Sequence, residues 1–240
     1  MSATPPRAAR LSWPSRLAMR CSDWAERWFP DAYVFAALAV GIVAAAALIA
    51  GASPRDTAAA FGKGYWSLVP FTMQMAFVVV AGFVLASAPP VARVIDRLAA
   101  WPRTGRGAVV FVALASMLTS LLSWGFSLVF AGRLVRALGR RHALDMDYRA
   151  AGAAAYLGLG AVWAMGLSSS AAQLQANPAS MPPGLLEITG VLPFTQTLFL
   201  WQSLLLTAVL IVVSALVAWH TAPRGDQAAV SYTHLTLPTN

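Results

Sequence analysis

Five uncharged, mostly apolar runs divide this sequence, and polar or charged segments separate them. A helix needs about 20 apolar residues to cross the hydrocarbon of a bilayer, and every run is long enough. The pattern therefore predicts an all-α polytopic membrane protein. The runs are residues 32–54, 64–92, 107–132, 150–186 and 188–223.

Composition supports this class. The chain is 58% hydrophobic and only 11% charged, whereas soluble domains carry about 25% charged residues. The net charge of +8 comes from basic residues outside the runs, where they set membrane orientation, so no nucleic-acid partner is expected. The single cysteine, Cys21, forms no metal-binding pair, and we expect no resident metal or cofactor.

The third run conflicts with five simple crossings. If every run crossed once from a cytoplasmic N-terminus, nine basic residues would lie inside and eight outside. If the third run enters and returns on the same side, the split becomes fifteen to two, which fits the positive-inside bias. We therefore predict about four transmembrane helices plus a re-entrant helical hairpin at about residues 107–138, with half-helices 108–122 and 126–138.

The predicted tip of this hairpin has the chemistry of an anion site. Gly125 would permit the turn, and Ser123 and Ser127 would supply hydroxyls beside the positive end of the second half-helix. Trp124 and Phe126 flank Gly125 at this tip, where Trp124 would wall a pocket. The alternative is that glycine and serine here only pack helices together; their presence alone favours packing, and the arginine distribution favours the hairpin.

The fourth run contains a second irregularity, within a predicted broken helix at about residues 150–176. Its centre reads Gly166, Leu167 and then Ser168, Ser169 and Ser170, and serines compete for their own backbone. A break here would place hydroxyls and free carbonyls near the hairpin tip, where carbonyls also coordinate cations. A serine-rich packing face is the alternative, and the sequence does not separate the two.

Outside the runs, the leader at residues 1–31 is predicted to hold an amphipathic helix at the membrane surface. Leu17, Cys21, Trp24 and Trp28 share one face of it, and arginines occupy the other. The transmembrane body is then residues 32–229. Residues 230–240, which include SYTHLTLPT, resemble translated sequencing-adapter DNA, and we expect a foreign tail on a truncated gene.

Several segments in this order resemble the short-chain fatty acid transporter family. They are WFPDAYVFA, FTMQMAFVVVAGFVLASAPPV, SWGFSLV, DYRAAGAAAYLGLG, GLSSSA and GVLPFTQTLF. The resemblance implies a secondary transporter that imports monocarboxylates such as acetoacetate or butyrate across the bacterial inner membrane by alternating access, coupled to H⁺ or Na⁺. It also implies two inverted halves, of which this chain would be the first. Family members carry asparagine at the position of Ser123 and glycine at that of Ser127.

Two other functions compete with transport. A membrane-embedded serine hydrolase would use Ser168, Ser169 or Ser170 as its nucleophile, but no general base lies in the spans, so we expect no enzyme. A structural or assembly subunit would not need two helix breaks at membrane depth. The small carboxylate and the lipid bilayer are the expected partners, with a homo-oligomer left open.

Overall fold

The computed structural model describes residues 13–223 except residue 182, and this part of the chain contains helices and no strands. Five of its helical segments are long and apolar enough to cross a membrane. These features confirm the predicted all-α polytopic class. Residues 1–12 of the leader and the predicted foreign tail at 230–240 lie outside the described residues.

The chain divides into two compact units, of which the smaller is residues 17–78. It contains most of α1, all of α2 and α3, and the first half of α4. Asp31 caps α2 by accepting a hydrogen bond from the Tyr33 amide at 2.8 Å, and α2 has no buried residue, as expected of a helix that faces lipid. The bounds are α1 Trp13–Trp28, α2 Ala32–Ile49, α3 Pro54–Ser67 and α4 Val69–Ser87.

The leader helix forms where the pattern predicts it. Pro14 lies in the first turn of α1 and Arg27 in its last turn. Leu17, Trp24 and Trp28 are exposed, so this apolar face is accessible. Its binding to a membrane surface stays a prediction.

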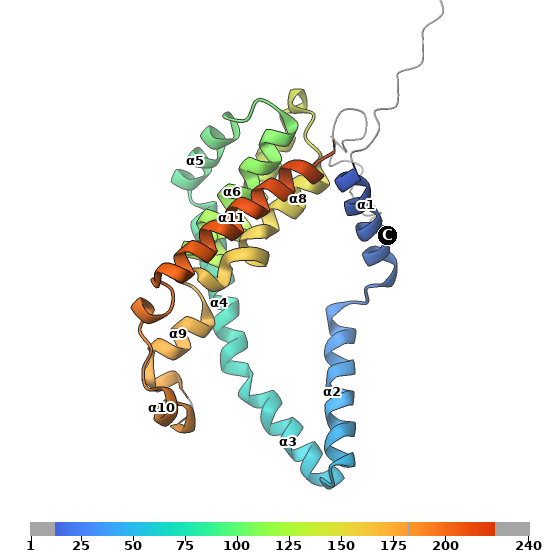
Figure 1. Ribbon diagram of the computed structural model, residues 1–240, viewed down its shortest axis with the longest axis vertical. Coiled ribbons are helices and arrows are strands. Elements are labelled where there is room, and N and C mark those ends of the chain that lie inside the picture. The colour runs from blue at the N-terminus through green and yellow to red at the C-terminus, as the bar shows by residue number, and fades with distance from the viewer. Residues whose placement is uncertain (1–12, 182, 224–240) are drawn as a thin grey trace, which may run out of the picture. The chain divides into compact units, whose positions relative to one another are not determined.

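The larger unit holds the core, which surrounds α6. Figure 1 shows α11 lying along α6 and α8. Alanines at the interfaces, including Ala108, Ala113, Ala131 and Ala151, are fully buried and let the helices approach closely, as small residues do in membrane proteins. The remaining helices are α5 Pro89–Ala99, α6 Gly105–Leu122, α7 Trp124–Gly139, α8 Tyr148–Leu157, α9 Ser170–Ala176, α10 Pro183–Thr189 and α11 Trp201–Thr221.

The chain reverses between α6 and α7 at one residue. Ser123 has an extended backbone (φ −154°, ψ 119°). It is both the C-cap residue of α6 and the N-cap residue of α7. The prediction that Gly125 makes the turn is wrong, because Gly125 already lies in α7. Here the backbones of α4 and α7 approach each other closely at Gly82 and Gly125. A Cβ built on Gly82 would lie 2.5 Å from the Gly125 carbonyl carbon.

The fourth apolar run is not a continuous α-helix. The α-helical hydrogen bonding of α8 ends at Leu157 and continues as a π-helical segment, Gly158–Val162, and a 3₁₀ turn, Trp163–Met165. Gly166 is extended (φ −94°, ψ 166°), and α9 begins at Ser170. The interruption therefore spans residues 166–169, inside the segment where serines compete with the helix.

The fifth run, residues 188–223, forms one long helix only from Trp201 to Thr221. Gly190 has a positive φ of 63°, and Pro193 precedes a single 3₁₀ turn, Phe194–Gln196. Apolar composition alone does not distinguish such a segment from helix, and α11 begins only at Trp201.

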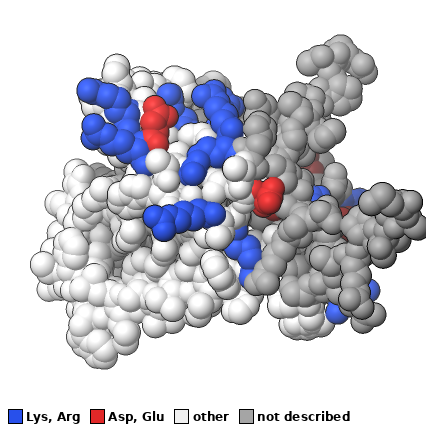
Figure 2. All heavy atoms as spheres, turned by 90° about the horizontal axis from the view of Figure 1, so that it is seen from above, with Lys and Arg blue, Asp and Glu red and all other residues white. Residues whose placement is uncertain are grey.

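Arginines gather at the end of the larger unit where α6 begins and α7 ends (Figure 2). Arg141 donates from Nη1 to the carbonyl of Ala99, the last residue of α5, at 2.5 Å, and to that of Pro102 in the α5–α6 connection, at 3.1 Å. Arg106 lies over the ring of Trp219 at 5.1 Å, a cation–π contact between α6 and α11.

Replacing Arg141 with alanine is expected to lower the free energy of unfolding by about 1–2 kcal/mol, because hydrogen bonds from charged donors contribute about that much at a partly exposed site. Thermal unfolding of the purified chain in detergent measures the change. The neighbouring Arg140→Ala is the matched control, since the structure describes no hydrogen bond from Arg140 to those carbonyls. Equal effects of the two substitutions would contradict the assignment.

Candidate functional site

The tip of the α6–α7 hairpin and the break in the fourth run contact each other. The Leu167 amide donates to the Leu121 carbonyl at 2.7 Å, and the Trp124 amide donates to the Ser168 hydroxyl at 3.0 Å. Two segments more than 40 residues apart in the sequence thus satisfy each other's loose backbone groups. We call this meeting point, residues 121–127 with 166–170, the junction.

Behind the junction, the buried serines Ser116, Ser120 and Ser127 join α6 to α7, to α8 and to the π-helical segment. The Ser116 hydroxyl donates to the Ala155 carbonyl at 2.5 Å and accepts from the Gly158 amide at 2.9 Å. The Ser120 hydroxyl donates to the Gly158 carbonyl at 2.8 Å. Where an α-helix changes to a π-helix, some backbone amides and carbonyls lose their intrahelical partners. The serine hydroxyls supply hydrogen-bond partners for backbone groups at this point.

Ser127 belongs to this buried network rather than to an open site. Its hydroxyl is 1% exposed and donates to the Ser116 carbonyl at 2.7 Å. Ser127 therefore fixes the two arms of the hairpin against each other, as the packing interpretation of these serines anticipates. In this arrangement the Ser127 hydroxyl proton is already in a hydrogen bond and is not available to a ligand.

The two glycines of the predicted site are buried for reasons of space. A Cβ on Gly166 would lie 2.7 Å from the Ser120 carbonyl oxygen, so only glycine lets the break approach α6. Gly125 is buried against Gly82 of α4. Ser169 is also buried and caps α9 through the Ala172 amide at 3.4 Å. These three residues shape the junction from behind.

The remaining predicted residues are only half-buried: Ser123, Trp124, Phe126, Ser168 and Ser170. The Ser123 hydroxyl accepts from the Phe126 amide at 3.4 Å, and the Ser168 hydroxyl accepts from the Trp124 amide. Within the described chain neither hydroxyl has an acceptor for its own proton. The Phe126 ring lies 5.3 Å from that of Phe130 and adds apolar surface.

No charged side chain belongs to the junction, whose residues are serine, glycine, leucine, tryptophan and phenylalanine. Its electrostatic potential comes from the first turn of α7, where the positive end of the helix dipole lies. Among the described residues, no group of His, Cys, Asp and Glu is arranged to hold a metal ion. The Ser123 and Ser168 hydroxyl protons are the donors that this arrangement leaves without an acceptor in the described chain.

Sequence reasoning missed four residues that build the site: Gly82, Ser116, Ser120 and Gly158. The signal for two of them was present, since Ser116 and Ser120 are spaced by four on one helix face, the spacing of small residues at membrane helix interfaces. Gly82 and Gly158 carry no such signal, because isolated glycines in apolar runs do not reveal which backbone approaches them.

Comparisons with known proteins agree with one another. A family model described as "Short chain fatty acid transporter" matches residues 14–235. A protein of Escherichia coli (strain K12) named "Putative short-chain fatty acid transporter" is 30% identical over 210 residues, which cover 87% of this chain and 47% of that protein.

A protein of the same name from Haemophilus influenzae is 27% identical over 218 residues, covering 89% of this chain and 48% of that protein. The chain thus spans about half the length of the curated relatives it matches. No solved structure gives a significant match.

Proposed function

Because the chain belongs to the short-chain fatty acid transporter family, we propose that it forms part of a carrier that imports short monocarboxylates such as butyrate or acetoacetate across the bacterial inner membrane. The carrier works by alternating access, with the N-terminus in the cytoplasm. The α6–α7 hairpin is its re-entrant element. The observation that supports this proposal most directly is the junction, where two broken helices meet.

The substrate carboxylate binds at the junction without a charged partner. Its oxygens accept hydrogen bonds from the Ser123 and Ser168 hydroxyls, whose protons have no other acceptor within the described chain. The positive end of α7 stabilises the negative charge. Charge-assisted hydrogen bonds of this kind are stronger than neutral ones, so two hydroxyls and a helix terminus suffice for a monoanion.

The short alkyl tail lies against the half-buried Trp124 and Phe126 rings, and Ser170 lines the same side of the break. Gly125, Ser127, Gly166 and Ser169 position these groups from the buried side. Transport also needs the site to open alternately to each side. Two short hydrogen-bonded contacts are suited to this, because they can break and re-form without separating buried charges.

Coupling to a cation follows from the same break. The interruption at residues 166–169 removes helical hydrogen bonds from nearby carbonyls, and unwound carbonyls coordinate Na⁺ in many secondary transporters. The site contains no carboxylate that could take up a proton, so we propose Na⁺ ahead of H⁺ as the coupling ion.

Uptake of labelled butyrate by the full-length carrier tests the carboxylate site. Ser123→Ala and Ser168→Ala are each expected to raise KM about tenfold to a hundredfold, because a hydrogen bond to a charged group contributes about 1.5–3 kcal/mol and each 1.4 kcal/mol is tenfold. Ser214→Ala, which changes a half-buried serine of α11, is the matched control. Unchanged KM in both junction variants would refute the proposed carboxylate position.

A further inference from the structure

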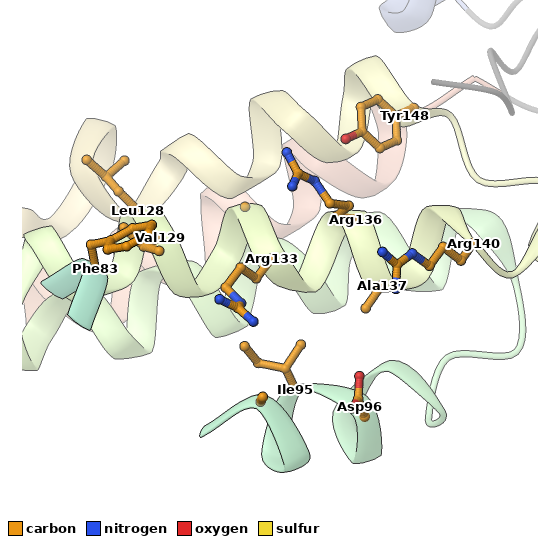
Figure 3. Close-up of a pocket in the computed structure, with 12 residues that line it drawn as sticks. Phe83, Ile95, Asp96, Leu128, Val129, Arg133, Arg136, Ala137, Arg140 and Tyr148 are labelled. Carbon is orange, nitrogen blue, oxygen red and sulfur yellow. The ribbon is translucent and has the colours of Figure 1, made fainter. Parts of the chain in front are cut away.

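A hollow lies on the larger unit, and none of its lining residues belongs to the junction. It is a groove of about 790 Å³ between α5 and α7, closed by the end of α4 and the start of α8. Figure 3 shows Phe83, Leu128 and Val129 together toward one end of it, with Arg136 and Arg140 toward the other. The groove is therefore amphiphilic along its length.

Its polar end carries an excess of positive charge. Arg133 and Arg136 of α7 and Arg140, the residue that caps its C-terminus, follow one another at spacings of three and four and all line the groove. On a helix these spacings place the three side chains on one face over about 10 Å. Asp96 of α5 is the acidic residue among the lining residues, and no ion pair joins it to these arginines in the described chain.

The deepest of the three arginines is held by a neutral partner. Arg133 is half-buried, and its Nη1 donates to the Ser87 hydroxyl at the end of α4 at 3.1 Å. Arginine near or within the hydrocarbon is costly unless an anion or water accompanies it. A row of guanidinium groups beside an apolar wall is therefore suited to an anion that also carries apolar surface.

We propose that this groove binds an anionic phospholipid, with the phosphate held by Arg136 and Arg140 and an acyl chain laid along Phe83, Leu128 and Val129. Guanidinium groups bind phosphate oxygens in a bidentate manner. Basic pockets between membrane helices are suited to lipid head groups. A short monocarboxylate fits the groove less well, since its short alkyl chain covers little of the apolar end of a cavity of about 790 Å³.

Native mass spectrometry of the purified chain in detergent tests the proposal, with phosphatidylglycerol and phosphatidylcholine of identical acyl chains as probes. We expect at least a tenfold preference for phosphatidylglycerol. The variant R133Q/R136Q/R140Q should lose that preference. If it fails to fold, R136Q/R140Q replaces it, because both side chains are exposed.

The matched control is R93Q/R97Q/R103Q, which removes the same charge from exposed arginines that do not line the groove. It should retain the preference. Loss in both triple variants would show general electrostatic attraction and overturn the site.

Competition experiments distinguish a lipid site from a site for a small free anion. Inorganic phosphate at millimolar concentration should not displace phosphatidylglycerol; displacement would identify a small-anion site and overturn the lipid assignment. Displacement by butyrate would assign the groove to the transported acid, with the same consequence. None of these measurements uses transport, so a failure here is distinguishable from a failure of the proposed carrier function.

Discussion

Replacing Gly82 with valine is expected to abolish butyrate uptake by the full-length carrier while the protein still inserts and folds. A Cβ at this position would lie 2.5 Å from the Gly125 carbonyl carbon and 2.6 Å from the Phe126 amide nitrogen. Both atoms are backbone, so no side-chain rotation relieves the contact. The first turn of α7 must move away from α4, and the hydroxyl and amide donors of the junction move with it.

Whole-cell uptake normalised to the amount of protein in the membrane measures this effect. Gly132→Val is the matched control, since Gly132 lies in α7 and a Cβ there meets no atom within 4 Å. The control should transport normally. Normal uptake by Gly82→Val would mean that the hairpin tip does not need its observed position against α4, and the assignment of the junction as substrate site would fail.

The helical class and both helix breaks follow from local features of the sequence. Runs of about 20 apolar residues predict helices wherever lipid is the solvent. The first break lies at Ser123, within the predicted tip at residues 123–125, whereas the return of this hairpin to the cytoplasmic side stays a prediction. The family resemblance, carried by ordered segments rather than by one motif, is confirmed by the family match over residues 14–235.

The roles of individual small residues did not follow from the sequence. Gly125 was predicted to form the turn, yet the extended backbone of Ser123 forms it, and Gly125 provides room for Gly82. Ser127 was predicted to offer a hydroxyl to the substrate, yet in the structure this hydroxyl donates a hydrogen bond to the Ser116 carbonyl. In each case the partner lies on another helix, and a local pattern holds no information about which helix comes to face it.

Hydrogen bonds with buried serines of α6 hold the backbone of the fourth run where its α-helix is interrupted. A π-helical segment shifts hydrogen bonds by one residue and leaves some groups without intrahelical partners. The Ser116 hydroxyl hydrogen-bonds the Gly158 amide and the Ala155 carbonyl, and the Ser120 hydroxyl hydrogen-bonds the Gly158 carbonyl. In hydrocarbon an unpartnered backbone group costs several kcal/mol, so this arrangement holds the junction in place from behind.

Replacing Gly158 with alanine is therefore expected to lower the free energy of unfolding by about 3 kcal/mol. A Cβ there would lie 2.5 Å from the Ser116 carbonyl oxygen and 2.6 Å from the Ser116 and Ser127 hydroxyls. Overpacking of a buried site costs about 1–3 kcal/mol. The methyl group also forces apart the hydrogen bonds that join Ser116 and Ser120 to Gly158, each of which contributes about 1 kcal/mol.

Unfolding of the purified chain in detergent, followed by circular dichroism, measures this loss. Gly152→Ala is the matched control, because Gly152 lies in α8 and a Cβ there meets no atom within 4 Å. Since alanine favours helix over glycine by up to about 1 kcal/mol, the control should be neutral or slightly stabilising. Equal stability of the two variants would show that α6 and the π-helical segment do not make the close contact on which the junction depends.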